Sequence, residues 1–479
     1  MLFNSITFAI FLPIIFIAYW FLLSKNVKQQ NILLLFASYF FYACWDWRFL
    51  FLLIFSTALD YLSGIQINKA NNSSKKKYWF WLSIIVNLGF LALFKYYNFF
   101  ITSFAEATAA FGFNFNPSTL NVILPVGISF YTFHGISYVI DVYNEKIKPE
   151  KNIVDYSLFV SFFPLLVAGP IERATHLLPQ LKVKRELKYS NAVIGLRQIL
   201  WGLFKKIVIA DQCAVYVNEI FAINSNFSGS TNFIGAILFS IQIYCDFSGY
   251  SDIAIGTAKL FGIDLLRNFS FPYFSRNIAE FWRRWHISLS TWFRDYLYIP
   301  LGGSKAGMLI QIRNVFIIFI VCGFWHGANW TFIFWGFLNA LYILPSIILK
   351  TNRNHLGIVA EDRFLPSLKE ILSICTTFLL CVLAWIFFRA ENLTHAFDFI
   401  HQIFSLTFFT KPSIFPKTVF SLIFFFMIVE WVGRKDQFAI EALFIKQRKI
   451  FRYSFYYLLV FAILFLIGSE QREFIYFQF

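Results

Sequence analysis

Two histidines lie beside tryptophans in apolar, glycine-containing stretches of the 479-residue sequence. His286 is in the motif FWRRWHISLSTWFRDYLYIPLGG (281–303), and His326 is in GFWHGANW (323–330). An ionisable side chain is costly inside a membrane, so it usually faces a cavity or the protein interior. A lone histidine there is often a core residue hydrogen-bonded to a backbone carbonyl. Two of them near glycine breaks favour a functional site.

Imidazole in this setting suits the transfer of an acyl group to an alcohol. A neutral imidazole can remove the alcohol proton as the oxygen attacks an acyl carbonyl, because its pKa lies near the operating pH. Burial lowers that pKa and keeps the base unprotonated. We therefore predict His326 and His286 as catalytic residues. The Asn329 amide is a candidate for orienting the nucleophile or stabilising the oxyanion, and Trp325 is a candidate substrate contact.

A metal or haem site is the competing interpretation of the histidine pair. Carboxylate or cysteine ligands at a characteristic spacing are absent from the motifs, although Cys322 lies one turn before His326. The six cysteines are scattered through apolar segments without a CxxC pair, which is typical of small hydrophobic side chains in helix packing. We predict no metal and no bound cofactor.

Charged side chains also interrupt apolar sequence. Asp246 and Asp252 flank Gly249, and this pattern predicts a broken helix that lines a polar cavity and contacts substrate. The alternative is that the two acids pair with nearby arginines. Lys205 and Lys206 are expected to reach the headgroup region or to pair with acids.

Three arginines near tryptophans are candidates for binding the acyl donor. Arg283, Arg284 and Arg294 suit the phosphates of a cytoplasmic donor, because a guanidinium group binds phosphate bidentately and stacks on rings. The alternative is a positively charged membrane surface anchored by its aromatic belt.

The composition identifies a polytopic membrane protein. Hydrophobic residues make up 58% of the chain, aromatic residues 22% and charged residues only 14%, which is too little charge for the surface of a soluble protein of this size. The net charge of +15 is explained by membrane insertion, and no nucleic-acid-binding module is present. We predict an all-α protein with roughly 11–13 membrane helices. The candidate spans are 4–22, 31–45, 48–66, 78–100, 120–141, 192–211, 233–262, 308–326, 328–349, 368–388, 415–432 and 453–469.

The loops differ in charge, which predicts the orientation of the chain. Residues 68–78 carry four lysines and residues 145–151 carry three, whereas 102–119 and 218–233 carry no lysine or arginine. By the positive-inside rule the first two loops are cytoplasmic and the N-terminus is extracytoplasmic. The first apolar stretch, 5–23, is interpreted as a retained membrane helix.

Two segments do not fit a simple span. Residues 154–170 are apolar but contain Pro164, Gly169 and Pro170, and so they suit a re-entrant or interfacial element whose broken backbone is buried in protein. Residues 264–307 are basic and aromatic, which is typical of a segment at the membrane surface. Without an internal repeat, the expectation is one membrane domain over 1–479.

The motifs resemble those of the membrane-bound O-acyltransferase (MBOAT) family, in particular the bacterial branch of alginate O-acetylation proteins, peptidoglycan O-acetyltransferases and teichoic acid D-alanyl transferases. The resemblance is carried, over nearly the whole chain, by LPVGISFYTFHGISYVIDVY (124–143), FFPLLVAGPIERATHLLPQL (162–181), QIYCDFSGYSDIAIG (242–256), NIAEFWRRWHISLSTWFRDYLYIPLGG (277–303), GFWHGANWTFIFWG (323–336) and FIYFQF (474–479). It implies a ring of membrane helices around a central funnel. It also implies that His326 is the catalytic base and that His286 lies on the donor side.

Two positions depart from the family pattern. His134 and Leu165 stand where glutamine is frequent in relatives. Either departure bears on acceptor choice, and neither touches the two motif histidines.

The first functional hypothesis is therefore an O-acyltransferase, most simply an O-acetyltransferase, of the bacterial cytoplasmic membrane. It would move an acyl group from a cytoplasmic thioester, acetyl-CoA or an acyl-carrier protein, to a hydroxyl of an exported cell-surface polysaccharide. Transfer would be direct or through an extracytoplasmic relay protein, and the other partners are membrane lipids. The alternatives are a transporter of the donor or of a lipid-linked sugar, although paired broken helices in inverted repeats are not seen, and a scaffold of a secretion complex.

Overall fold

The computed structural model describes residues 1–479 except 114, 121–122, 223–225, 306, 469–471, 473 and 476–479. All regular structure in the described residues is helical. The chain divides into two compact units: unit 1 is Met1–Ala192 with Thr257–Leu266, and unit 2 is Val193–Gly256 with Arg267–Phe479. The prediction of a single membrane domain stays a prediction.

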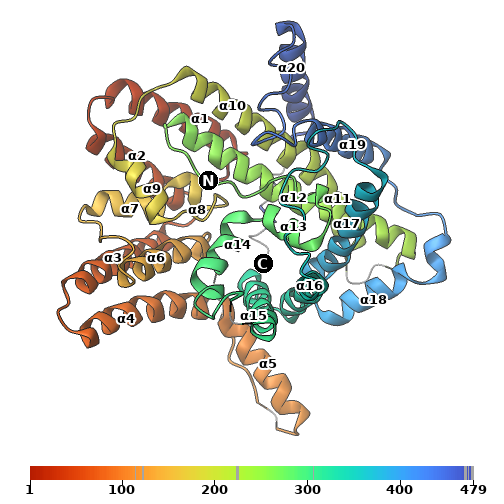
Figure 1. The fold of residues 1–479 in the computed structure, drawn as a ribbon, viewed down its shortest axis with the longest axis horizontal. Helices are drawn as coiled ribbons and strands as arrows, with labels where there is room; N and C mark the ends of the chain where they lie inside the picture. Colours follow the sequence, from red (N-terminus) through yellow and green to blue (C-terminus); the bar gives the residue numbers. More distant parts are fainter. Residues whose placement is uncertain are drawn as a thin grey trace. The chain divides into compact units, whose positions relative to one another are not determined.

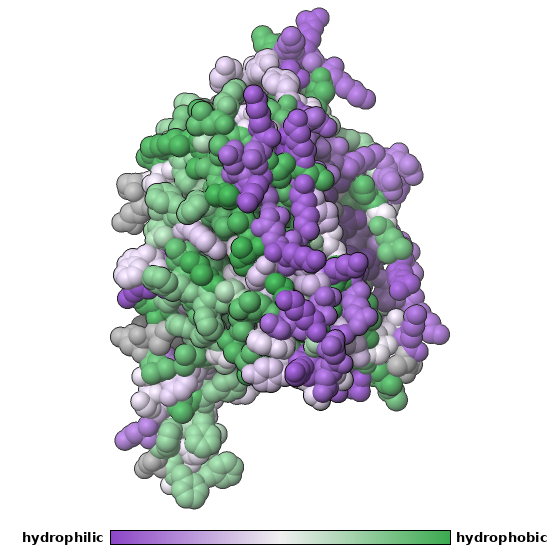
Figure 2. All heavy atoms as spheres, turned by 90° about the vertical axis from the view of Figure 1, so that its left-hand side faces the viewer, coloured by the Kyte–Doolittle hydropathy of each residue, from purple (hydrophilic) through white to green (hydrophobic). Residues whose placement is uncertain are grey.

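The predicted polytopic membrane protein is confirmed. Seven helices among the described residues are long and apolar enough to cross a membrane: Trp47–Lys69, Ser73–Ala110, Gly229–Leu260, Met308–His326, Trp330–Ile348, Leu368–Arg389 and Lys449–Leu466. Shorter apolar helical stretches cover Ile6–Leu22 and Ile153–Leu166. On the face drawn in Figure 2, hydrophobic side chains cover a broad area and hydrophilic side chains gather beside it. Such separation suits a surface that meets both lipid and water.

Unit 1 is built from helices whose starts are encoded locally. Its elements are α1 (Ile6–Ile17), η1 (Ala18–Leu22), α2 (Val27–Ala43), α3 (Trp47–Lys69), α4 (Ser73–Leu91), η2 (Ala92–Tyr96), α5 (Tyr97–Ala110), α6 (Ile128–Tyr143), α7 (Ile153–Ser161), α8 (Phe163–Leu166) and α9 (Ala174–Lys182). The side chains of Asn26, Asp46, Asn72 and Asn152 accept backbone N–H bonds at the starts of α2, α3, α4 and α7, as is usual for N-caps.

Helices α3 and α4 lie side by side (Figure 1) and share a buried polar cluster. The Asp60 carboxylate in α3 accepts hydrogen bonds from Ser83 Oγ at 2.6 Å and Asn87 Nδ2 at 2.8 Å, both in α4. Each buried polar group thus has a partner, as an apolar surrounding requires.

The segment predicted as re-entrant is broken and buried. Helix α7 ends at Ser161, Phe162 is non-helical, and α8 covers only four residues. The residues 155–172 are buried throughout. The backbone break is therefore enclosed in protein, which is the condition under which irregular structure is tolerated in an apolar region.

Unit 2 carries both motif histidines. Its elements are α10 (Tyr189–Leu203, which starts in unit 1), η3 (Phe204–Ala210), α11 (Asp211–Ile220), α12 (Gly229–Leu260, which ends in unit 1), η4 (Pro272–Phe274), α13 (Ile278–Arg284), α14 (Ile287–Phe293), η5 (Arg294–Tyr298), α15 (Met308–His326), α16 (Trp330–Ile348), α17 (Leu368–Arg389), α18 (Leu393–Ile403), η6 (Leu406–Phe409), α19 (Lys417–Val432) and α20 (Lys449–Leu466). Helices α15 and α16 form an antiparallel hairpin (Figure 1).

The predicted helix break between Asp246 and Asp252 is wrong. Helix α12 runs without interruption through Gly249, and 89% of its apolar stretch is buried. The glycine serves close packing instead: a Cβ at Gly249 would lie 2.8 Å from the carbonyl oxygen of Gly202, and one at Gly202 would lie 2.6 Å from that of Gly249. The irregular backbone lies in the partner, because α10 continues into the π-helical η3 just after Gly202.

We expect Gly202→Ala to destabilise the protein by about 1–3 kcal/mol, because the added methyl group has no space between α10 and α12. Gly89→Ala in α4 is the matched control. A Cβ there meets no atom within 4 Å, so the variant should be stabilised by up to about 1 kcal/mol through helix propensity. Thermal unfolding of the purified variants in detergent measures both changes, and equal midpoints for the two variants would contradict the packing argument.

Candidate active site

His286 occupies a strained junction between two short helices. It is the N-cap of α14, directly after α13 and Trp285, and its backbone is left-handed with φ 41° and ψ 56°. A conformation of this kind is unfavourable for a residue other than glycine. Asn268 holds the turn: its carbonyl accepts from Ile287 N at 2.8 Å, and its Oδ1 accepts from Ser288 Oγ at 2.6 Å. The strain is therefore imposed by specific hydrogen bonds.

The His286 ring is enclosed by aromatic residues. The side chain is only 4% exposed, and its ring meets Phe247 edge-on at 4.6 Å and stacks near Phe269 at 6.4 Å. Its Nδ1 has no hydrogen-bond partner among the described residues. Burial lowers the pKa of His286 well below the ordinary value, and the nearby His326 lowers it further. His286 is consequently neutral near pH 7.

His326 is the last residue of α15, at the turn into α16. It is 7% exposed, and its ring meets those of Trp335 and Phe388 edge-on at 5.3 Å each. Its Nε2 lies 3.7 Å from Cys322 Sγ, one helical turn earlier. Gly327 follows in extended backbone, and a Cβ there would lie 2.1 Å from the Phe332 ring. The glycine of the motif is therefore needed for the close approach of the Phe332 ring beside the histidine.

The structure brings the two histidines into one electrostatic environment. A positive charge on His326 disfavours one on His286. A row of tryptophans extends from one motif to the other, with ring centroids 4.9 Å apart for Trp285 and Trp385 and 5.6 Å for Trp385 and Trp335. A neutral imidazole can accept and return a proton, and His286 is held in this state by its burial and by His326. Their catalytic role stays a prediction.

Asn329 is committed to local structure. Its Oδ1 caps α16 by accepting from Thr331 N at 3.0 Å, and its Nδ2 donates to the Glu391 carbonyl at 2.8 Å. An amide with both ends engaged is held rigidly, but it has fewer free donors for an oxyanion. Trp325 is partly exposed beside His326. The substrate contacts expected of both residues stay predictions.

The three arginines predicted to bind the donor have intramolecular partners. Arg283 donates to the carbonyls of Asn352 at 2.7 Å and His355 at 2.8 Å. Arg284 pairs with Glu280 at 2.9 Å, and Arg294 pairs with Asp295 at 2.7 Å. Phosphate binding by any of them would have to compete with these contacts, and it stays a prediction.

Asp246 and Asp252 pair with lysines rather than with arginines. Lys205 Nζ lies 2.6 Å from Asp252 Oδ2, and Lys206 Nζ lies 2.7 Å from Asp246 Oδ1. Lys206 also contacts Asp211 at 2.8 Å. Buried charges need such partners because desolvation is costly. The close approach of α10 and α12 thus brings oppositely charged side chains together.

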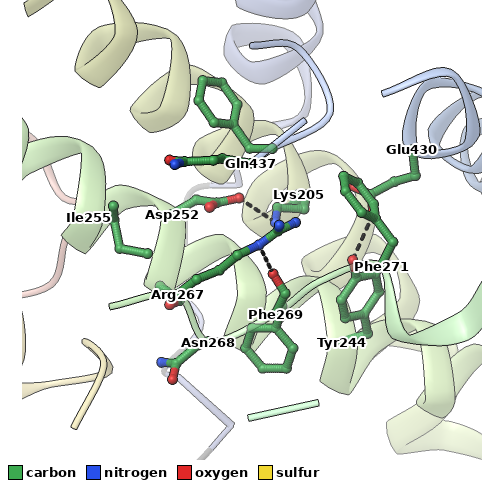
Figure 3. A pocket seen from close by; sticks show the side chains of 12 residues that line it. Lys205, Tyr244, Asp252, Ile255, Arg267, Asn268, Phe269, Phe271, Glu430 and Gln437 are labelled. Carbon is green, nitrogen blue, oxygen red and sulfur yellow. Dashed lines mark hydrogen bonds and ion pairs between the residues drawn. The ribbon is translucent and has the colours of Figure 1, made fainter. Parts of the chain in front are cut away.

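A small cavity beside Lys205 and Asp252 is lined by polar groups (Figure 3), including Arg267 and Glu430. Its volume is about 20 Å³, which is space for about one water molecule. Glu430 accepts a hydrogen bond from Tyr244 OH at 2.7 Å, which holds the tyrosine ring in place at the edge of the cavity. The cavity is too small for an acyl donor or a sugar, so the charged cluster holds the core together. The substrate role expected of the two aspartates stays a prediction.

The C-terminal motif packs against the site, which sequence reasoning did not foresee. Phe474 is fully buried, with its ring 5.7 Å from Phe247 and 4.7 Å from Tyr250. The next residue, Ile475, donates its backbone N–H to Asp246 Oδ2 at 2.7 Å. The FIYFQF motif was the sequence feature that could have indicated this packing. Its last four residues lie outside the described part of the chain.

Metal ligands are not clustered here. Within the described ranges, no group of three or more His, Cys, Asp or Glu side chains is arranged to hold a metal ion. The six cysteines are all free. Both imidazoles instead lie among aromatic side chains.

The sequence has clear relatives. Residues 149–388, which contain both histidines, match the sequence model of the membrane-bound O-acyltransferase family (MBOAT). The chain is 40% identical over 408 residues to the probable alginate O-acetylase AlgI of Pseudomonas aeruginosa, covering 85% of this chain and 75% of that protein. It is 39% identical over 425 residues to the peptidoglycan O-acetyltransferase of Helicobacter pylori (83% and 78%), and 28% identical over 291 residues to the teichoic acid D-alanyltransferase of Bacillus subtilis (57% and 71%).

We expect Asp252→Ala to cost about 3–5 kcal/mol, because it leaves the buried Lys205 without its carboxylate. The double variant Asp252→Leu with Lys205→Met should recover part of this loss, since it removes both charges. Arg363→Ala, which breaks an exposed pair with Glu370, should cost at most about 1 kcal/mol. Denaturant unfolding in mixed micelles ranks the variants, and equal losses for Asp252→Ala and Arg363→Ala would refute the structural role.

The neutral state of His286 has a consequence for stability. Its pKa in the folded protein lies below the unfolded value of about 6.5, so its contribution is intact above pH 6.5 and is lost as the pH falls below it. The slope is at most about 1.4 kcal/mol per pH unit. His286→Asn tolerates the left-handed backbone and should lose less stability than wild type between pH 7 and pH 5. Parallel losses in the two proteins would show that His286 does not titrate in this way.

Proposed function

Because the chain belongs to the membrane-bound O-acyltransferase family and is an acyltransferase of the membrane, we propose that it transfers an acetyl group to a hydroxyl of an exported cell-surface polysaccharide. The donor is a cytoplasmic thioester, acetyl-CoA or an acyl-carrier protein. Two relatives at 40% and 39% identity are named for O-acetylation of alginate and of peptidoglycan. The observation that carries the proposal is the pair of buried, electrostatically coupled imidazoles within the matched region.

His326 acts as the general base. The acceptor oxygen attacks the thioester carbonyl carbon, its proton passes to the imidazole, and collapse of the tetrahedral intermediate breaks the C–S bond. The imidazolium then returns the proton to the leaving thiolate. The aromatic surroundings of His326 exclude water, which would otherwise hydrolyse the thioester.

His286 assists as a neutral partner. Its low pKa keeps it from competing for the proton held by His326, and its position at a strained turn fixes its ring. The donor approaches from the side of His286, as the family resemblance implies. Transfer is direct or passes through an extracytoplasmic relay protein.

We expect His326→Ala to reduce ester formation by about 10²–10⁴-fold, the usual contribution of a general base, without loss of folded protein. His355→Ala is the matched control, because this partly exposed histidine contacts Arg283 only through its backbone carbonyl. The measurement is the ester-linked acetyl content of the cell-surface polysaccharides in cells that lack the protein and carry each variant. Equal ester content with His326→Ala and wild type would remove the base assignment and would favour the transport or scaffold alternative.

A further inference from the structure

A second polar site in unit 2 is lined by residues that belong to neither histidine motif. It is a cavity of about 550 Å³, a size typical of small-ligand sites. We call it the amide pocket. Its described lining residues are Asn226, Phe227, Asn232, Asn392, Thr394, His395, Asp398, Phe399, His401 and Gln402, from the start of α12 and from α18.

The lining is rich in hydrogen-bonding groups and poor in charge. Amide, hydroxyl and imidazole groups dominate it, Asp398 is the one carboxylate among the described lining residues, and these include no lysine or arginine. Burial lowers the pKa of His395 from its ordinary value, so this imidazole is neutral near pH 7. Such a surface suits a neutral ligand with many hydroxyl groups, and it does not attract anions.

One side chain is held ready for a ligand. Asn232 is 5% exposed, and its Oδ1 has no hydrogen-bond partner among the described residues. A buried amide oxygen without a partner is costly. The cost is removed when a ligand hydroxyl donates to it.

The wall around Asn232 is rigid. Gly229 N donates to Thr407 Oγ1 at 2.9 Å, and Ser413 N donates to Thr231 Oγ1 at 3.1 Å. Asn392 Oδ1 accepts from His395 N at 2.9 Å and so fixes the start of α18. The first two contacts join the start of α12 to η6 and to the connection before α19, and the third stabilises α18 locally. The pocket is therefore formed before a ligand arrives, which reduces the entropic cost of binding.

The polar lining is a local feature. A neighbouring groove of about 340 Å³ is lined almost entirely by apolar side chains of α17, α18 and η6, together with Phe233. Asn232 and Phe233 are adjacent in sequence but line the two different cavities. The groove suits lipid chains, whereas the amide pocket suits water-soluble groups.

The charge distribution of unit 2 indicates which side of the membrane the pocket faces. The end of α17 lies near the segment before α12, since Arg389 donates to Asn218 at 3.1 Å. The start of α17 lies near the end of α19, since Trp431 Nε1 donates to the Phe364 carbonyl at 2.9 Å. This second end carries a linked set of basic residues: Arg276, Arg283, Arg284, Arg363, Arg434 and Lys435. By the positive-inside rule the basic end is cytoplasmic and the amide pocket is extracytoplasmic.

We propose that the amide pocket binds a neutral, hydroxyl-rich segment of the acceptor polysaccharide on the extracytoplasmic side. Amides and imidazoles hydrogen-bond to the sugar hydroxyls, and Phe227 offers an apolar wall for a sugar face. The proposal rests on the proposed function, because it names a subsite for that acceptor. It adds a binding site outside the histidine motifs, which would hold the polymer between transfer events.

The test is a binding measurement on the purified full-length protein in nanodiscs with cellotetraose, a neutral probe, and tetramannuronate, an acidic one. Wild type should bind cellotetraose more tightly than tetramannuronate. The variant Asn232→Leu with Gln402→Leu should bind cellotetraose at least about tenfold more weakly, which corresponds to the loss of one or two hydrogen bonds. Its melting temperature should be unchanged or raised, because neither amide side chain has a hydrogen bond to lose among the described residues. Lys411→Ala, an exposed control near Ser413, should bind as wild type does.

Three results would overturn the proposal: no binding of cellotetraose to wild type, equal binding by the double variant, or tighter binding of tetramannuronate. The polysaccharide ester content of cells with the double variant separates this proposal from the proposed function. Ester formation that depends on His326 in the wild type, together with unchanged cellotetraose binding in the double variant, would refute the pocket and leave the acetyltransferase intact. The opposite pair of results would support the pocket and refute the acetyltransferase: the purified double variant loses cellotetraose binding as expected, while cells with the wild-type protein show no ester that depends on it.

Discussion

Lys205 and Lys206 are buried in the core of unit 2, and each needs a carboxylate within hydrogen-bonding distance because an unpaired charge in an apolar interior is very costly. Asp252 and Asp246 on α12 supply these carboxylates. The pairs form only because Gly202 lets the two backbones approach. Helix α12 then presents Phe247 to His286, so the geometry around this imidazole depends on the packing that the charged pairs require.

The same cost of burial governs the histidines. Burial lowers the pKa of His286, and a positive charge on His326 lowers it further, so the two rings are not charged together. Aromatic side chains lie against both rings, Phe247 and Phe269 at His286 and Trp335 and Phe388 at His326. The Asn268 contacts hold the backbone at His286, and Gly327 allows the Phe332 ring to pack closely beside His326. Fixed geometry is one way in which an active site accelerates group transfer.

Polarity is distributed unevenly along unit 2. Basic side chains gather where α17 begins and α19 ends, while the amide pocket at the start of α12 has no basic lining residue in the described part. Such asymmetry is what the proposed transfer from a cytoplasmic donor to an exported acceptor predicts. Arg283 and Arg284 also stabilise this end of unit 2, because they hydrogen-bond to the carbonyl groups of Asn352 and Gly357.

The sequence by itself determined the membrane character, the order of most helices and the two histidine motifs, because hydrophobic length and motif chemistry are local properties. It also identified the broken segment at 154–170, since proline and glycine interrupt a helix wherever it lies. It was wrong about a break between Asp246 and Asp252. A glycine within an apolar stretch can break a helix or can let a second helix pack closely against it, and the sequence pattern is the same in both cases. Only the tertiary structure decided that α12 is continuous, that lysines pair with its acids, and that Ile475 bonds to Asp246. Those outcomes depend on contacts between residues far apart in the chain, and no local pattern encodes which distant partner offsets the cost of burial.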